Sequence, residues 1–127
     1  MIDLPLRGQT LKGNNGMNDK NCYTLAANYI LMHNDGCRLV HGIPTLIAGN
    51  YAGKKYGHAW IEYGNVCYDV VVKQWIPKAV YYGIGKIEYT VSYSRSLAMQ
   101  NLRETGHYGA WDEKIADAFH SNDIKGD

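Results

Sequence analysis

The stretch Gly57-His58-Ala59-Trp60-Ile61-Glu62-Tyr63-Gly64-Asn65-Val66-Cys67-Tyr68-Asp69 predicts a β-hairpin around which the rest of the chain is organised. Two runs rich in β-branched and aromatic residues flank Gly64-Asn65, a pair typical of a two-residue II′ or I′ turn. If these two residues form the loop, Tyr63 lies opposite Val66. This pairing sets the register of the whole hairpin.

The predicted hairpin has two faces, because successive side chains of a strand point to opposite sides of the sheet. One face is nearly continuous apolar surface and is expected to meet the core; it carries Ala59, Ile61, Tyr63, Val66, Tyr68 and Val70. The other face is mixed and carries His58, Trp60, Glu62, Cys67 and Asp69.

On the mixed face, His58 and Asp69 are diagonal neighbours across the two strands. Their Cα atoms are expected to lie roughly 7–8 Å apart, within reach of an imidazole and a carboxylate. A carboxylate that holds one ring nitrogen of a histidine is the orienting half of a nucleophilic triad. The pair therefore points to a nucleophile elsewhere in the chain.

Cys22 is the candidate nucleophile. A helix is predicted to follow Asp19 or Asn21 as N-cap and to stop at Asn34-Asp35-Gly36, because apolar residues recur there at helical spacing. A helix N-terminus and a nearby imidazole both favour a thiolate, and His58 would supply the imidazole if this helix packs across the mixed face. The plain alternative is a small buried cysteine in a helix.

The other elements follow from periodicity and turn residues. Residues 37–43 predict a short strand, and 45–56 either extend it or form a hairpin turn or loop. Val70-Val71-Val72 is expected to prolong the second hairpin strand, Trp75-Ile76-Pro77 to break regular structure, and 79–85 to be irregular. Residues 86–93 alternate as a half-buried strand.

Two helices are predicted near the C-terminus. Ser94 caps the first, which runs to about Glu104 with Gly106 as its terminator and Leu97, Ala98 and Leu102 facing inward. Asp112 caps a short second helix through Phe119. Helix, strands and then helices indicate an α+β fold with an antiparallel sheet. Residues 1–127 are expected to form one domain, with 1–20 as an irregular lead-in.

Composition limits the function classes. The 127 residues are 46% hydrophobic and 20% charged with a net charge of +1, and no Lys/Arg cluster interleaves with aromatic residues, so nucleic acid is not an expected partner. No stretch approaches the ~18 apolar residues of a membrane span, and no secretion signal is evident. We therefore expect a cytoplasmic site, or delivery by a non-signal route.

Tyrosine outnumbers phenylalanine by eleven to one. This bias fits either an aromatic-lined groove that grips a polymer or strand tyrosines whose hydroxyls reach water.

An acyl-transfer site also needs donors for the oxyanion. The backbone N–H of Cys22 is one candidate, and Asn21, Asn18 or Asn15 could supply another. Trp60 either shields the His58–Asp69 contact from water or is a core aromatic. The 107–111 loop, with His107 and Trp111, either lines the substrate cleft or packs down on the body.

Metal binding is the rival chemistry, because histidine, cysteine and aspartate are all present. The sequence contains no Cys-x-x-Cys or His-Glu-x-x-His spacing, so no metal or other cofactor is expected. Three cysteines cannot all pair within one chain, and in a reducing compartment all three would be thiols.

Several of these residues together resemble the papain-like thiol-enzyme superfamily, especially its transglutaminase-like and small bacterial or phage branches. They are Asn21-Cys22-Tyr23 at a helix start, a strand ending near His41-Gly42, His58-Ala59-Trp60 in a strand, and Cys67-Tyr68-Asp69 in the next. The resemblance implies Cys22 as nucleophile, His58 as general base and acid, and Asp69 as the orienting carboxylate. Two features depart from it: no glutamine stands close before Cys22, and Val70-Val71 follows Asp69 where many members turn at Asp-Pro.

The resemblance and the residues together predict a cysteine-dependent hydrolase or acyltransferase that acts on an amide or thioester of a protein or peptide. Release of the acyl group to water would make it a peptidase or amidase, and transfer to an amine would make it transglutaminase-like. One alternative is a cell-wall peptidase, because residues 57–65 look similar to the histidine strand of NlpC-type and CHAP-type enzymes. The other is a non-catalytic binding module on the same fold, such as a phage protein that captures a host factor.

Overall fold

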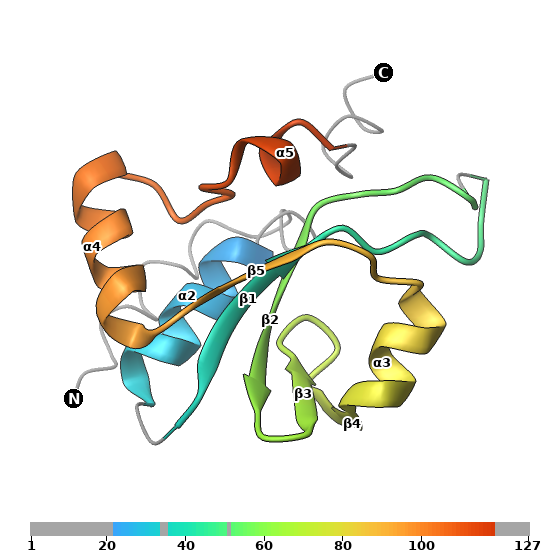
Figure 1. Cartoon of the computed structure of the whole chain (residues 1–127), viewed down its shortest axis with the longest axis horizontal. Coiled ribbons are helices and arrows are strands. Elements are labelled where there is room, and N and C mark those ends of the chain that lie inside the picture. The colour runs from blue at the N-terminus through green and yellow to red at the C-terminus, as the bar shows by residue number, and fades with distance from the viewer. Residues whose placement is uncertain (1–21, 34–35, 51, 119–127) are drawn as a thin grey trace.

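The computed structural model describes residues 22–33, 36–50 and 52–118, which form an α+β fold around an open antiparallel sheet (Figure 1). The sheet has five strands in the order β4-β3-β2-β1-β5. Along the chain the elements are α2 (Cys22–Met32), β1 (Arg38–Gly42), β2 (His58–Tyr63), β3 (Val66–Asp69), β4 (Gln74–Pro77), α3 (Lys78–Gly85), β5 (Thr90–Tyr93), α4 (Arg95–Thr105) and α5 (Glu113–Ala116). The expected lead-in at 1–20 lies outside the described residues.

The predicted hairpin is confirmed as β2 and β3. Tyr63 pairs with Val66 and Ile61 with Tyr68, the register that a Gly64-Asn65 loop requires. Of the two loop residues only Gly64 has a positive φ, 59°, which fits a type II′ turn. One part of the face prediction is wrong: Tyr63 is 52% exposed, because it sits beside the loop and beyond the reach of the core.

The second hairpin strand does not continue through residues 70–72 as predicted. It ends at Asp69, residues 70–73 turn, and β4 returns antiparallel with Gln74 opposite Asp69. Lys73 closes this turn with a φ of 58° and donates its N–H to the Asp69 carbonyl. The expected break at 75–77 is therefore a strand. The valines at 70–72 are β-branched, which favours a strand. The Asp69 side chain instead accepts the N–H groups of Val71 and Val72, and these bonds favour the turn.

Residues 79–85, expected to be irregular, form helix α3. Pro77 precedes the helix, and Lys86 ends it in the left-handed conformation. Pro at a helix start is favoured, but two glycines in the last three residues hide the helical pattern. The helix forms because its tyrosines pack on the sheet.

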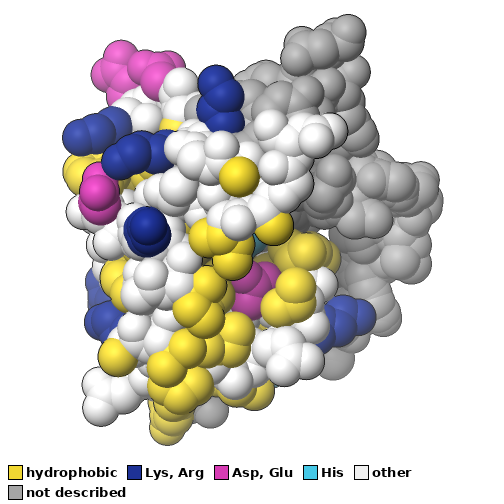
Figure 2. All heavy atoms as spheres, turned by 90° about the vertical axis from the view of Figure 1, so that its right-hand side faces the viewer, with side chains coloured by type: hydrophobic (Ala, Val, Ile, Leu, Met, Phe, Trp, Pro, Cys, Tyr) yellow, Lys and Arg dark blue, Asp and Glu magenta, His cyan; other side chains and the backbone are white. Residues whose placement is uncertain are grey.

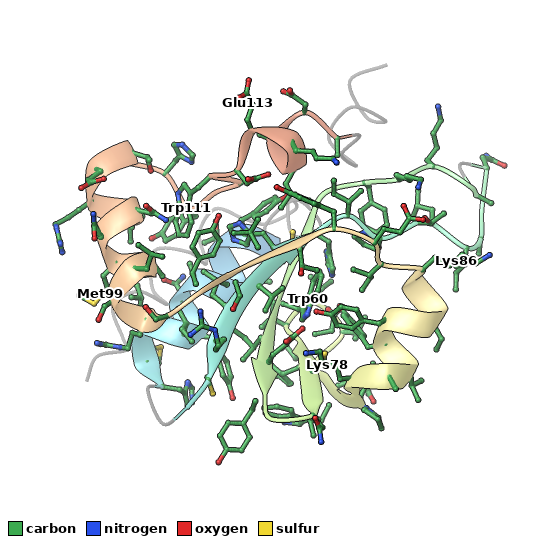
Figure 3. The ribbon with its side chains drawn as sticks, in the orientation of Figure 1. Trp60, Lys78, Lys86, Met99, Trp111 and Glu113 are labelled. Atoms are coloured by element: carbon green, nitrogen blue, oxygen red, sulfur yellow. The ribbon has the colours of Figure 1, made fainter. Side chains whose placement is uncertain are left out.

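The sheet is covered on both faces. On one face α2, α4 and α5 enclose a core that includes Ala26, Ile30, Leu39, Ile61 and Ile115. On the other, residues of α3 and the segment after it pack over Val40, Trp60 and Cys67. In Figure 3, Trp60 and Lys78 lie on the α3 side of the sheet, and Trp111 lies on the side of α4 and α5. The mixed hairpin face is thus also buried.

The two C-terminal helices are confirmed with small changes. The Ser94 hydroxyl accepts the Leu97 N–H, Gly106 closes α4 with a φ of 77°, and the Asp112 side chain caps α5. Leu97, predicted to face inward, is 40% exposed, whereas Ala98 is buried. Helix α5 ends at Ala116, short of the predicted Phe119, which lies outside the described residues.

Of the two other predicted strands, the first matches the prediction closely and the second is shorter than predicted. β1 confirms the strand expected at 37–43, whereas β5 covers only the second half of 86–93. Residues 45–56 make a hairpin-like loop closed by an isolated bridge between Thr45 and Lys55. No helix among the described ranges has the length and apolar character needed to cross a bilayer.

Candidate active site

Three predicted site residues meet at one end of the sheet. His58 begins β2 and Asp69 ends the antiparallel β3, so both lie at the same end, and Cys22 is the first residue of α2. His58 Nε2 lies 3.1 Å from Asp69 Oδ2. The two side chains are only 13% and 11% exposed, so water competes little for this contact.

The Asp69 carboxylate is held on both oxygens. Oδ2 accepts the Tyr81 hydroxyl at 2.5 Å in addition to His58, and Oδ1 accepts the backbone N–H groups of Val71 and Val72 at 3.0 and 3.3 Å. Burial by itself raises the pKa of this carboxyl, but the bonds from His58, Tyr81 and Val71 outweigh burial and hold the pKa well below its usual range. The orienting group is therefore ionised and fixed in place.

The thiol of Cys22 is the second partner of His58. Burial lowers the pKa of the imidazole and is the largest single effect. The charge of Cys22, hydrogen bonds with Asp69 and Cys22, and the charge of Asp69 together reverse it and raise the pKa to about 10. The Cys22 side chain therefore lies close enough to the imidazole to affect its pKa.

The helix that carries Cys22 does not pack across the mixed face of the hairpin, as the sequence analysis supposed. It packs on the opposite, apolar face, in the same core as Ala59 and Ile61. His58, the first residue of β2, nevertheless lies close enough to Cys22 for that thiol to affect the pKa of its imidazole.

A cavity of about 320 Å³ opens beside the imidazole. Its polar lining includes His58, Asp69, Tyr56 and Tyr81, and its apolar lining is Pro44, Leu46, Ile47, Ile76, Ile84 and Ile87, among others. Figure 2 shows a hollow on this side of the molecule, with an acidic side chain at the bottom and hydrophobic side chains around it. The His58–Asp69 pair is thus reached through an apolar opening.

Two tyrosines of this site were missed by sequence reasoning. Tyr81 binds Asp69 from α3, a segment whose glycines hide its helical character. Tyr56 lines the cavity with its ring 5.7 Å from that of His58, and burial, followed by the charges of Asp69 and Cys22, raises its pKa to about 12. Its phenol is therefore a protonated donor at neutral pH. In the sequence, only the high number of tyrosines could have indicated that tyrosines line the site.

Trp60 is fully buried beneath α3, with its ring 6.0 Å from His58 and 5.4 Å from Tyr81. Its indole donates to Glu62 Oε2 at 3.0 Å, and the Tyr82 hydroxyl donates to the same oxygen. Lys78 forms an ion pair with the other oxygen at 3.3 Å. Trp60 is therefore a core residue that also packs against the catalytic candidates.

The other predicted residues lie apart from this cavity. Trp111 packs against His41 and Tyr93, with ring centroids 5.2 and 5.1 Å away, and its indole donates to the carbonyl of His107. His107 itself is exposed. Neither residue lines the cavity beside His58, so the 107–111 loop packs on the body. Asn15, Asn18 and Asn21, the candidate oxyanion residues, lie outside the described residues.

Cys22 is buried, with 5% of its surface exposed, and it differs from the other two cysteines in acting on the pKa of His58. Cys67 is fully buried at 3.8 Å from Glu62, and burial, reinforced by the charge of Glu62, raises the pKa of its thiol to about 12. Cys37 is half-buried. Within the described part of the chain, no three His, Cys, Asp or Glu side chains gather as metal ligands. The candidate thiol chemistry centres on Cys22.

Comparison of the chain with protein-family models, curated proteins and solved structures gave no match. The function of the chain is therefore inferred from the geometry of the site.

Proposed function

We propose that this chain is a papain-like cysteine hydrolase or acyltransferase that uses Cys22, His58 and Asp69 on an amide or thioester. The observation that carries the proposal is the His58 imidazole, which is bonded to the Asp69 carboxylate and lies close enough to Cys22 for that thiol to raise its pKa. Such an arrangement generates a nucleophile and keeps its base in one orientation. The turn directly after Asp69 supports it, because it supplies the bend that Asp-Pro gives other members of the superfamily.

The reaction follows from these three groups. The Cys22 thiolate attacks the substrate carbonyl carbon, and the tetrahedral oxyanion collapses with breakage of the bond to the leaving atom. His58 gives its proton to that atom as it departs. Water or an amine then attacks the thioester and loses a proton to His58, and the carbon–sulfur bond breaks to restore the thiolate. Asp69 keeps the ring in place throughout.

Alkylation with iodoacetamide tests the pair directly. The labelling rate of each cysteine is measured by mass spectrometry from pH 5 to 9 in the wild type and in His58→Ala. We expect Cys22 to label at least about tenfold faster than Cys37 at pH 6, because an ordinary thiol is almost entirely protonated there. His58→Ala should abolish this advantage.

His107→Ala is the matched control, because this histidine is exposed and does not line the cavity. It should leave the labelling rate of Cys22 unchanged. If Cys22 labels no faster than Cys37 and ignores the loss of His58, the binding-module alternative replaces the enzyme. Release of peptide fragments from purified peptidoglycan, lost in Cys22→Ala, would select the cell-wall alternative.

A further inference from the structure

The Tyr56 hydroxyl is a hydrogen-bond donor that an occupant of the cavity beside His58 can use. Tyr56 lines the cavity, and no described residue accepts a hydrogen bond from its phenol. The Tyr81 hydroxyl, by contrast, already donates to Asp69 at 2.5 Å. Burial and the charges of Asp69 and Cys22 raise the pKa of Tyr56 to about 12, so its phenol keeps its proton at neutral pH.

The Tyr56 side chain is fixed at the wall of the cavity by its neighbours. Its backbone N–H donates to the Pro44 carbonyl at 2.9 Å, and its ring lies 5.7 Å from the ring of His58. Pro44 and His58 also belong to the lining. Because the donor is in place before a ligand enters, less conformational freedom is lost on binding.

The two charged groups that line the cavity balance one another. Asp69 is ionised, because its pKa lies well below the usual range, and His58 is protonated at neutral pH, because its pKa is raised to about 10. They lie 3.1 Å apart, so together they attract neither sign of charge strongly. The described lining contains no lysine, arginine or glutamate. A charged occupant would exchange its hydration for neutral partners such as the Tyr56 hydroxyl, which favours an uncharged occupant.

The rest of the lining is largely apolar, and part of it is exposed to solvent. Ile47 and Ile84 line the cavity and are 62% and 54% exposed. Covering such side chains with an apolar group removes their surface from water, which favours binding. Figure 2 shows hydrophobic side chains around the hollow. The volume of about 320 Å³ lies at the lower end of the range for ligand pockets, so it suits a small molecule.

We propose that this cavity binds a small uncharged apolar molecule that carries one hydrogen-bond acceptor, such as a carbonyl oxygen. The acceptor receives the hydrogen bond of the Tyr56 hydroxyl, and the hydrocarbon part packs against the isoleucines of the lining. Binding requires no reaction at Cys22, so this site is independent of the proposed function.

NMR of the isoleucine methyl groups in the whole chain measures the binding. Acetophenone has an apolar ring and one carbonyl acceptor, and ethylbenzene has nearly the same shape without the carbonyl. Both should shift the methyl signals of the isoleucines that line the cavity and leave those of the buried core unchanged. The lining isoleucines are Ile47, Ile76, Ile84 and Ile87, and those of the core are Ile30, Ile61 and Ile115. We expect acetophenone to bind about fivefold more tightly than ethylbenzene, because only acetophenone accepts a hydrogen bond.

Tyr56→Phe tests the role of the hydroxyl. It should weaken the binding of acetophenone about fivefold and leave the binding of ethylbenzene within about twofold of the wild type. Tyr63→Phe is the matched control, because it removes an exposed hydroxyl that is not part of the described lining. It should leave the binding of both compounds unchanged.

Two substitutions on α3 test the apolar rim. Ile84→Ser should weaken the binding of both compounds severalfold, because it places a polar group at the rim. Val80→Ser changes a similarly exposed residue of the same helix that is not part of the described lining, and it should leave the binding of both unchanged.

Benzoate and benzylammonium have a similar shape and carry a negative and a positive charge. Each should bind at least about tenfold more weakly than acetophenone. Tighter binding of either ion would overturn the assignment of an uncharged ligand. Equal losses for acetophenone and ethylbenzene in Tyr56→Phe would overturn the role of the hydroxyl, and unchanged lining methyl signals with both neutral compounds would overturn the site. None of these results depends on the reactivity of Cys22, so failure of the site and failure of the proposed function are distinguishable.

Discussion

The Asp69 carboxylate illustrates how a single residue organises the candidate site. Its side chain joins a histidine, a tyrosine and two backbone amides that come from different parts of the fold. Each bond favours the ionised form, which keeps the negative charge beside His58 at neutral pH. The bonds from Oδ1 to Val71 and Val72 also hold the turn that follows β3, so one residue serves both the fold and the candidate site.

Tyr81→Phe should weaken this arrangement without altering the imidazole or the thiol. Loss of the hydroxyl removes a donor from the Asp69 carboxylate, so the pKa of Asp69 should rise toward its usual range. We expect NMR titration of the Asp69 carboxyl to show uptake of its proton at a higher pH than in the wild type.

Tyr82→Phe is the matched control for this change. It removes a hydroxyl bonded to a carboxylate from the neighbouring position of α3, but that carboxylate is Glu62. It should leave the titration of Asp69 unchanged. Equal shifts in both variants would contradict a specific role of Tyr81 in positioning Asp69.

Because His41 is buried, we expect the free energy of unfolding to fall in acid. His41 is fully buried, neither ring nitrogen has a hydrogen-bond partner among the described residues, and Tyr23, Tyr93 and Trp111 surround it. Burial lowers its pKa to about 3, against a partial opposing effect of Asp112. A histidine whose pKa is lower in the folded than in the unfolded chain destabilises the fold as the pH falls below about 6.5.

Urea unfolding at pH 6.5 and at pH 5 measures this effect. His41 should account for a loss of up to about 2 kcal/mol in the free energy of unfolding between these pH values. Asp69 contributes little in this window, because its lowered pKa costs stability only as the pH approaches the usual aspartate range and below. In His41→Leu, the free energy of unfolding should fall less between pH 6.5 and pH 5 than in the wild type. An identical fall in the variant and the wild type would contradict a buried neutral His41.

At the scale of elements, the β2–β3 hairpin and α3 use glycine for different reasons. Gly64 has a φ of 59°, which a side chain disfavours, whereas Gly83 lies within a helix with open space around it. The hairpin needs its glycine, and the helix only tolerates one.

The same substitution should therefore have opposite effects in the two elements. Gly64→Ala should lower the free energy of unfolding by about 1–2 kcal/mol, the cost of a left-handed residue with a side chain. Gly83→Ala should raise it by up to about 1 kcal/mol through helix propensity. Thermal or urea unfolding of both variants tests the pair, and destabilisation by Gly83→Ala would contradict the open helical setting.

At the scale of the whole molecule, α4 is tied to the helix that carries Cys22. Arg95, the first residue of α4, donates from Nε and Nη2 to the Leu31 carbonyl near the end of α2, at 3.1 and 2.9 Å. These bonds satisfy a carbonyl that has no partner within its own helix. They join segments more than sixty residues apart in the chain.

Arg95→Ala should destabilise the fold by about 1–3 kcal/mol, because it removes charged hydrogen bonds from a partly buried carbonyl. Arg103→Ala changes an exposed arginine of the same helix and should stay within about 0.5 kcal/mol of the wild type. Urea unfolding of both variants measures the difference. Equal effects would show that the bonds from Arg95 add nothing beyond an ordinary surface arginine.

Residues close together in the chain are enough to specify the local structure. The Gly64-Asn65 loop fixed the hairpin and the diagonal position of His58 and Asp69, because side-chain alternation follows directly from register. Ser94, Gly106 and Asp112 marked the helix ends, since caps are satisfied by neighbours in the chain. The order of elements indicated the α+β class with an antiparallel sheet.

The groups that surround the site depend on packing between elements that are distant in the chain. Helix α3 forms by packing its tyrosines on the sheet, and its glycines conceal it from pattern reasoning. Tyr81 therefore reaches Asp69 through a contact between elements that no local signal encodes. The cavity likewise draws residues from five separate segments, represented by Pro44, Tyr56, Asp69, Ile76 and Ile84. The register of a hairpin depends on residues that are close together in the chain. A cavity depends on how distant elements pack, and the order of elements along the chain does not specify that packing.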